Sequence, residues 1–205
     1  MKMLQMMKTC SLFRSVWLVL YVCFGTVFLL AVICVPVATR ATTLMRMSLA
    51  RMVQAAPIIV RTRCIANSTA WTAGEIWTLT AFAVEQTWKG SLPTEITVRL
   101  LGGSVGNLSS HVSGIPRFRP GEEAVLFLEP TSLGDYSVLA WQQGTFRIQR
   151  DPATAEESVT QDTSAFATFD PATRRFETVG IRRRAVSDFH AEINSALHTP
   201  GGPAQ

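Results

Sequence analysis

One segment of this sequence matches a catalytic motif, the G-x-S-x-G pattern of serine hydrolases, at Gly-Gly-Ser-Val-Gly over residues 102–106. In those enzymes the serine lies on a sharp turn between a strand and a helix, so that backbone N–H groups face the developing oxyanion. An apolar strand pattern precedes Ser104, but the segment that follows, NLSSHVSGIP, has no helical apolar period. We therefore expect a flexible glycine-rich loop over residues 102–116, and a serine hydrolase centred on Ser104 is the least favoured alternative.

The remaining residues that could do chemistry form no recognisable site. The three histidines, His111, His190 and His198, show none of the spacings at which zinc enzymes place their ligands. Glu122 and Glu123 enter a predicted strand, where successive side chains point to opposite faces and cannot act as a paired acid and base. Neither a P-loop nor a dinucleotide-binding glycine pattern occurs. We expect no catalytic residue, no metal ligand and no cofactor, and a protein that is not an enzyme.

Two groups of residues remain as candidates for a binding surface. Trp77 and Trp88 lie an odd number of residues apart on one predicted strand, so one should pack in the core and the other be partly exposed. The basic segment RRFETVGIRRR could contact an anionic lipid or a polyanion, although a solvated face is the simpler interpretation. The candidate positions are Trp71, Trp77, Trp88, Ser104, His111, Arg174, Arg175, Arg182, Arg183 and Arg184.

The elements that must position these residues follow from apolar periodicity. A short helix is expected after Ser48, its N-cap, and then the period changes from 3.6 to 2. Six short strands with turns between them and no intervening helix predict a small antiparallel barrel or sandwich. These strands are expected over residues 58–66, 75–90, 95–101, 122–130, 136–141 and 145–150. Cys64 alternates with apolar residues of the first strand, which indicates a small buried side chain.

An apolar leader precedes these elements. Residues 15–37 carry no charge and follow a basic, acid-free start over residues 1–14, the plan shared by secretory signals and signal-anchors. The length of the apolar run favours a retained single-pass anchor, whereas a small-x-small pattern allows cleavage near Ala41. A third interpretation is that the chain starts at Met45 or Met47. In the first two cases the rest of the chain is exported.

The charge balance belongs largely to this leader. The chain has 205 residues and a formal net charge of +4, of which residues 1–37 supply three basic residues and no acidic one. The remainder holds 16 basic and 15 acidic residues, so we expect no nucleic-acid partner. Four cysteines are too few for a disulfide scaffold, and a single long apolar run excludes a multi-span transporter.

The predicted organisation is therefore a series of segments. The first part comprises a basic cytoplasmic n-region (1–14), a transmembrane helix or signal h-region (15–37) and a linker (38–47). A β-barrel domain (48–150) follows, and then a mobile excursion (151–185) that contains a candidate extra strand over 174–181. The chain closes with a C-terminal helix (186–199) and a tail (200–205). In the C-terminal helix, Ser187 is the expected cap, and Phe189, Ile193 and Leu197 fall on one face.

Several stretches of residues 47–150 carry a resemblance. The segments PIIVRTRCIA, VEQTWKG, FRPGEEAVLFLEP and YSVLAWQQGTFRI resemble a family of uncharacterised exported bacterial proteins. The strand order and the W-K-G break are similar to the oligonucleotide/oligosaccharide-binding (OB) barrel of tissue inhibitors of metalloproteinases and netrin modules. Those inhibitors chelate the protease zinc through an N-terminal Cys, whereas Ala38 and Thr42 stand at the new termini expected here and Cys64 is internal. The resemblance implies an OB-like barrel and does not imply zinc-directed inhibition.

The expected fold class is thus mainly β, with an N-terminal transmembrane or signal helix, a short helix, a small antiparallel OB-like barrel and a C-terminal helix. The expected function is a non-catalytic binding or structural module of the bacterial cell envelope, membrane-anchored or secreted. A protease inhibitor-like or protease-associated module acting through residues 102–116 is the main alternative. The expected partners are the membrane, through residues 15–37, and an envelope or secreted protein.

Overall fold

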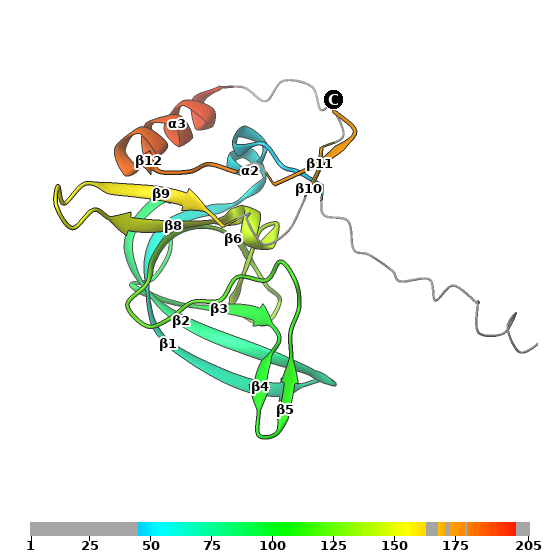
Figure 1. The fold of residues 1–205 in the computed structure, drawn as a ribbon. Helices are drawn as coiled ribbons and strands as arrows, with labels where there is room; N and C mark the ends of the chain where they lie inside the picture. Colours follow the sequence, from blue (N-terminus) through cyan, green and yellow to red (C-terminus); the bar gives the residue numbers. More distant parts are fainter. Residues whose placement is uncertain (1–44, 163–167, 171–172, 179, 200–205) are drawn as a thin grey trace, which may run out of the picture. The chain divides into compact units, whose positions relative to one another are not determined.

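The computed structural model describes residues 45–162, 168–170, 173–178 and 180–199 (Figure 1). These residues belong to one compact unit, Thr43–Gln205. The predicted n-region, the apolar segment 15–37, most of the linker and the tail 200–205 lie outside the described residues. Among the helices that are described, none has both the length and the hydrophobicity needed to cross a bilayer.

The described part of the chain is mainly β and ends in a helix, as predicted. Its elements are α2 (Leu49–Ala55), β1 (Ile58–Thr72), β2 (Glu75–Lys89), β3 (Glu95–Leu101), β4 (Gly103–Val105), β5 (Leu108–Ser110), β6 (Glu123–Pro130), β7 (Tyr136–Val138), the 3-10 helix η1 (Trp141–Gly144), β8 (Thr145–Arg150), β9 (Glu157–Gln161), β10 (Thr168–Asp170), β11 (Arg175–Glu177), β12 (Arg184–Ala185) and α3 (Val186–His198).

Strand β1 organises the sheet because it pairs along both of its edges, with β2 on one side and with β6 on the other. From β2 the pairings continue to β3, which meets β7 in parallel, and β7 pairs with β6, so the series of pairings returns to β1. Beyond β6 the sheet continues through β8, β9 and β12. Register irregularities between β1 and β2 let these two long strands bend, since each bulge increases the local twist.

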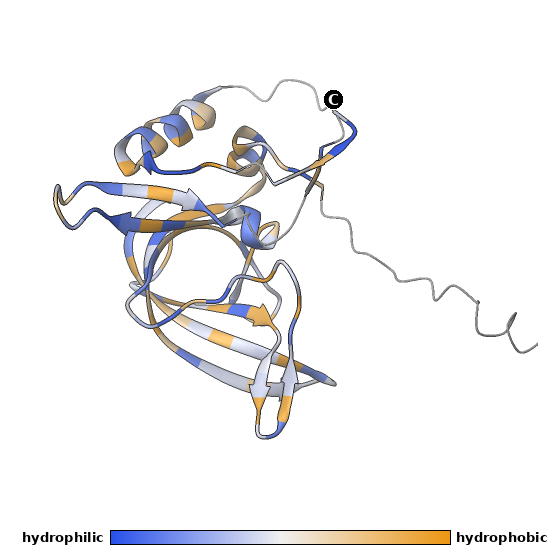
Figure 2. Ribbon diagram, viewed as in Figure 1, coloured by the Kyte–Doolittle hydropathy of each residue, from blue (hydrophilic) through white to orange (hydrophobic). Residues whose placement is uncertain are grey.

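Two hydrophobic clusters lie on opposite faces of β1. Val60 and Cys64 contribute to the first, which is enclosed by β2, β3 and β6, whereas Ile59 contributes to the second. In the second cluster α2 and α3 cover the sheet, with Phe189 packed against Phe146 at 4.6 Å between ring centroids. Hydrophobic residues recur along the strands and both helices with hydrophilic ones between them (Figure 2). β1 is therefore buried on both faces over residues 58–60, and the alternation that follows buries one face only.

Several local predictions are confirmed. The Ser48 hydroxyl accepts a hydrogen bond from the backbone N–H of Arg51 and caps α2. Cys64 is buried. On α3, Phe189 and Ile193 are buried and Leu197 packs against the same cluster, which is the predicted apolar face.

Other boundaries differ from the predictions. β1 continues to Thr72, beyond the predicted end at residue 66, because it remains paired with β2 up to a turn in which Ala73 and Gly74 adopt positive φ. The segment 102–116, predicted as a loop, contains the β4–β5 hairpin. The predicted strand 136–141 ends at Val138, since left-handed residues and η1 follow it.

The C-terminal part also departs from expectation. Within residues 151–185, predicted as an excursion, β9 pairs with β8 and with β12 and so extends the main sheet. Among the described residues of the candidate strand 174–181, β11 is the segment that forms a strand, and it pairs with β10. The Ser187 cap is wrong: α3 begins at Val186, and Ala185 in the N-cap position offers no side-chain acceptor.

Candidate functional site

The predicted nucleophile Ser104 lies in a hairpin. It is the middle residue of β4, where its hydroxyl donates to the Ser109 hydroxyl at 3.2 Å and its carbonyl accepts from the Thr69 hydroxyl at 2.7 Å. The strand-to-helix turn that the G-x-S-x-G motif requires is therefore replaced by a strand-to-strand turn. His111 is exposed beyond β5, and His190 stacks on Trp88 with ring centroids 4.4 Å apart. Within the described structure, neither histidine makes a hydrogen bond with Ser104.

The three candidate tryptophans occupy separate environments. Trp71, near the end of β1, is 53% exposed. It pairs with Ile76, so its side chain lies on the same face of the sheet as Ile76 and on the opposite face from Trp77. Trp77 is partly buried beneath the Arg99 guanidinium, 5.4 Å from its ring centroid. Trp88 packs on Phe189 of α3, with ring centroids 6.1 Å apart. These tryptophans form no shared aromatic surface.

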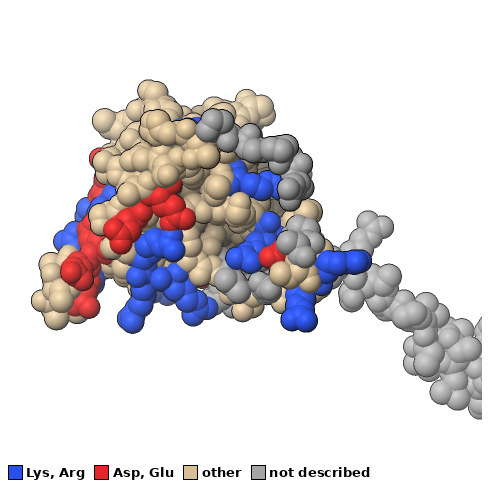
Figure 3. Space-filling view, turned by 90° about the horizontal axis from the view of Figure 1, so that it is seen from above, with Lys and Arg blue, Asp and Glu red and all other residues tan. Residues whose placement is uncertain are grey.

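The five arginines of the basic cluster lie in three places. Arg174 and Arg175 are exposed at the β10–β11 hairpin, and Arg183 lines a pocket of about 600 Å³ beside the β8–β9 turn. Arg182 and Arg184 instead line a pocket of about 690 Å³. Viewed over α3, Lys and Arg side chains gather on one side of the molecule (Figure 3).

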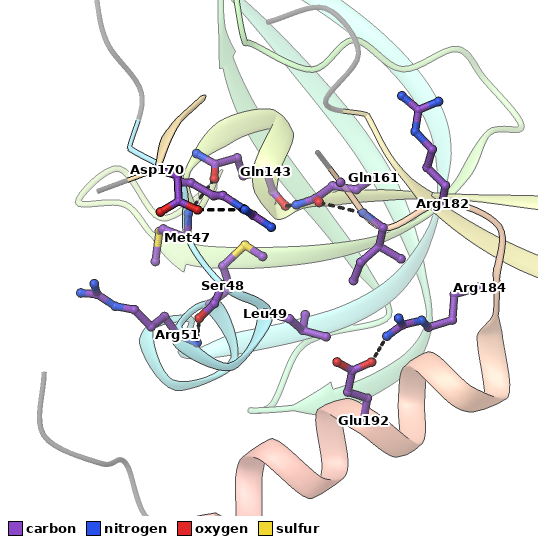
Figure 4. A pocket seen from close by; sticks show the side chains of 14 residues that line it. Met47, Ser48, Leu49, Arg51, Gln143, Gln161, Asp170, Arg182, Arg184 and Glu192 are labelled. Atoms are coloured by element: carbon purple, nitrogen blue, oxygen red, sulfur yellow. Dashed lines mark hydrogen bonds and ion pairs between the residues drawn. The ribbon is translucent and has the colours of Figure 1, made fainter. Parts of the chain in front are cut away.

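This arginine-rimmed pocket lies between α2, η1, the end of β9, residues 180–184 and α3 (Figure 4). Its cationic lining residues are Arg46, Arg51, Arg182 and Arg184. Its other lining residues are Met47, Ser48, Leu49, Met52, Gln143, Gln161, Asp170, Gly180, Ile181 and Glu192. Residues near both ends of the described chain, such as Arg46 and Glu192, therefore line the same pocket.

Two glutamines fix the backbone around the pocket. The Gln143 side chain donates to the carbonyl of Met45 and accepts from the N–H of Met47, both at 2.9 Å. The Gln161 side chain donates to the carbonyl of Gln143 at 2.5 Å and accepts from the N–H of Ile181 at 3.3 Å. These bonds hold the segments that carry Arg46 and Arg182 against the sheet, which reduces the entropy that would be lost on binding a ligand.

The charges of the pocket are only partly balanced. The Arg46 guanidinium pairs with Asp170 at 3.0 Å, and Arg184 pairs with Glu192. The side chains of Arg51 and Arg182 are exposed, and neither has a recorded ion pair or hydrogen bond with the described residues. The pocket lining thus contains four arginines and two acidic residues.

The floor of the pocket is apolar. Met47, Leu49 and Ile181 pack against the second hydrophobic cluster, to which Met52 belongs. In Figure 4, Leu49 lies between Arg51 on one side and Arg184 on the other. A cationic rim around an apolar floor can accept a ligand that is both negatively charged and hydrophobic.

Arg61 on β1 has a different environment. Its guanidinium lies 3.0 Å from Glu85, 2.7 Å from Glu123 and 2.8 Å from Glu157. The hydrogen bond with Glu157, followed by the bonds with the other two carboxylates, raises the pKa of Arg61 despite its partial burial. In return, hydrogen bonds from Arg61 and then Arg150 lower the pKa of Glu157 to about 2. This cluster is a structural ion-pair network whose charges are satisfied within the fold.

Arg182 and Arg184 are candidates from the sequence, whereas Arg46, Arg51 and both glutamines of the pocket are not. Arg46 and Arg51 flank a helix cap, and Gln143 and Gln161 lie in a 3-10 helix and at a strand end. No spacing or motif joins these positions, because they meet only after folding, through the pairing of β8 with β9 and the hydrogen bonds of Gln143 to the segment before α2.

No protein-family model matches this sequence, and a comparison with curated proteins gives no significant match.

Proposed function

We propose that this protein is a non-catalytic binding module of the bacterial cell envelope, either anchored by residues 15–37 or secreted after cleavage near Ala41. The observation that carries the binding role is the arginine-rimmed pocket, in which Arg51 and Arg182 present charge without a recorded partner among the described residues. Its volume of about 690 Å³ falls within the range of about 300–1,000 Å³ typical of small-molecule sites.

We also propose that the sheet is an OB-like barrel. The order β1-β2-β3-β7-β6 with a return to β1, together with the parallel contact of β3 and β7 at Val98 and Tyr136, supports this assignment. The first hydrophobic cluster would be the interior of such a barrel, and α2 and α3 would cover its outer side. In this arrangement the pocket lies at the barrel's outer surface, beside the helices.

The leader supports the location. Its charge-free run of residues 15–37 after three basic residues is the pattern of an exported chain. We test export with a C-terminally tagged full chain in spheroplasts treated with external protease. Loss of the tag in intact spheroplasts is the expected result, and a tag protected until lysis would overturn export. Mass spectrometry of the mature N-terminus separates a retained anchor from cleavage near Ala41.

A second candidate function is docking to a protease through residues 102–116. The β4–β5 hairpin in this segment carries Leu108, which is 57% exposed, and it lies against β1 through the bond from Thr69 to Ser104. An exposed apolar residue on a projecting hairpin is a feature that a protein partner can bury. Co-purification of an exported protease with the wild-type full chain, lost in Leu108→Asp, is the expected result for this candidate. Equal recovery with both chains would remove it.

The hydrolase alternative has its own test. A fluorophosphonate probe should leave the full chain unlabelled, because Ser104 lies in a hairpin without a recorded histidine partner in the described structure. Labelling that disappears in Ser104→Ala would overturn the non-catalytic assignment.

A further inference from the structure

We infer that the arginine-rimmed pocket binds an anionic amphiphile, a molecule with one acidic head and an aliphatic chain. The inference rests on the proposed binding role and specifies its ligand class. It depends on three properties of the pocket, namely its uncompensated cations, its apolar floor and its fixed backbone.

The uncompensated cations determine the charge of the ligand. Arg46 and Arg184 each meet a carboxylate within the pocket, so their charge is partly neutralised. Arg51 and Arg182 keep their charge and their donor groups available toward solvent. In Figure 4 these two side chains lie at opposite ends of the pocket and extend away from it, so an acidic head at either end would draw one of them over the pocket. The head would then receive charge-assisted hydrogen bonds, which are roughly twice as strong as neutral ones.

The apolar floor determines the rest of the ligand. Met47, Leu49 and Ile181 are partly exposed where they line the pocket, and an aliphatic chain would remove their remaining apolar surface from water. Methionine side chains adapt to irregular ligands because they are unbranched and polarisable. A simple inorganic anion would leave this floor exposed, and a neutral chain would leave the guanidinium groups unpaired.

The fixed backbone makes the site available before binding. Gln143 and Gln161 already hold the flanking segments by hydrogen bonds, so a ligand need order only the exposed arginine side chains. The same chemistry is offered by a free fatty acid and by an anionic membrane lipid with its head and upper chain. The experiment distinguishes these two sources.

The test uses the purified full chain in phosphatidylcholine nanodiscs and a diazirine-bearing decanoate as probe. Mass spectrometry measures labelling of the peptides that contain Met47, Leu49 and Ile181 as the probe concentration rises. The variant Arg51→Glu/Arg182→Glu should raise the half-saturating concentration at least tenfold. The matched control is Arg119→Glu, an exposed arginine that does not line the pocket, and it should bind like the wild type.

Competition assigns the ligand class. Unlabelled decanoate should compete, whereas decanol and inorganic phosphate should compete at least tenfold less well. Full competition by decanol would overturn the anionic head, and full competition by phosphate would overturn the aliphatic chain. Equal labelling of wild type and the double variant would overturn the site itself. Nanodiscs containing phosphatidylglycerol should suppress labelling if membrane lipid is the source, and should leave it unchanged if a free fatty acid is.

This result is independent of export. Labelling of the purified chain does not depend on where the protein lies in the cell. If labelling succeeds and the spheroplast experiment fails, only the assignment to the cell envelope is overturned. Failed labelling with successful export removes only the ligand class.

Discussion

Arg61 on β1 and Arg51 on α2 belong to the same compact unit, yet only the charge of Arg61 is neutralised by neighbouring carboxylates. The Arg61 side chain is 17% exposed and contacts three carboxylates. Arg51 is exposed, lines a pocket and has no recorded ion-pair partner among the described residues. The first cluster contains its own counter-charges, and the second leaves positive charge for something outside the fold.

This difference shows why the number of arginines says little about function. A guanidinium satisfied by carboxylates contributes to the fold and offers no charge to a partner. One left unpaired beside an apolar floor adds little to stability and becomes available for binding. Stability should therefore depend on the Arg61 network, and affinity should depend on the pocket.

The largest effect on stability is expected from Arg61→Met. This change leaves Glu85, Glu123 and Glu157 close together without their central cation, and like charges then repel one another. Removal of one partner from this partly buried ion-pair network should cost about 2–3 kcal/mol of unfolding free energy. The urea midpoint of the full chain, followed by tryptophan fluorescence, measures this loss. A change below about 0.5 kcal/mol would show that the network is not structural.

The pH dependence of the network gives the next largest effect. The pKa of Glu157 is lowered from its ordinary value of 4.5 to about 2, so its ionised form stabilises the fold fully above pH 4.5. That contribution is lost as the pH falls from about 4.5 toward 2. Allowing for solvent screening, the wild type should lose about 1–2 kcal/mol more than Glu157→Gln between pH 5 and pH 2. Parallel acid titrations of both chains in urea check this; identical losses would contradict it.

Arg63→Ala is expected to have a small effect, although Arg63 contacts two of the same carboxylates as Arg61. Its side chain is 52% exposed, compared with 17% for Arg61. Exposed ion pairs contribute little to stability, so the loss should be only a small fraction of that caused by Arg61→Met. The same urea assay measures it. A loss as large as that of Arg61→Met would mean that exposure does not separate the two residues.

The smallest effect on stability is expected from Arg51→Glu/Arg182→Glu. Both side chains are exposed and neither has a recorded partner in the described structure, so the free energy of unfolding should change by less than about 0.5 kcal/mol. A larger loss in urea unfolding would show that the pocket arginines support the fold. The pocket would then resemble the Arg61 network.

Much of the fold could be predicted from local pattern. Alternation in β1, β2, β3, β6 and β8 gave correct strand cores, and the Ser48 cap placed the start of α2. The end of β1 could not be predicted, because NSTAWT is polar and stays extended only through its pairing with β2. Likewise, β9 lies in a polar segment that forms a strand through its pairing with β8.

The candidate site was less predictable than the fold. Arg182 and Arg184 were visible as part of a charge run, but that run also contains Arg174, Arg175 and Arg183, which lie outside the pocket. Whether an arginine is neutralised depends on the carboxylates that tertiary structure brings to it. Arg61 and Arg51 therefore look equivalent in the sequence and differ only after folding.

The most direct test of this contrast is the rise in the urea midpoint of the full chain, in phosphatidylcholine nanodiscs, when decanoate is added. At ten times Kd the ligand should stabilise the wild type by about 1.4 kcal/mol. Arg61→Met should show the same rise from a lower starting point. Arg51→Glu/Arg182→Glu, whose Kd is expected to be at least tenfold higher, should be stabilised by no more than about 0.4 kcal/mol. A rise of equal size in the double variant, or no rise in the wild type, would contradict the division between a structural and a binding arginine cluster.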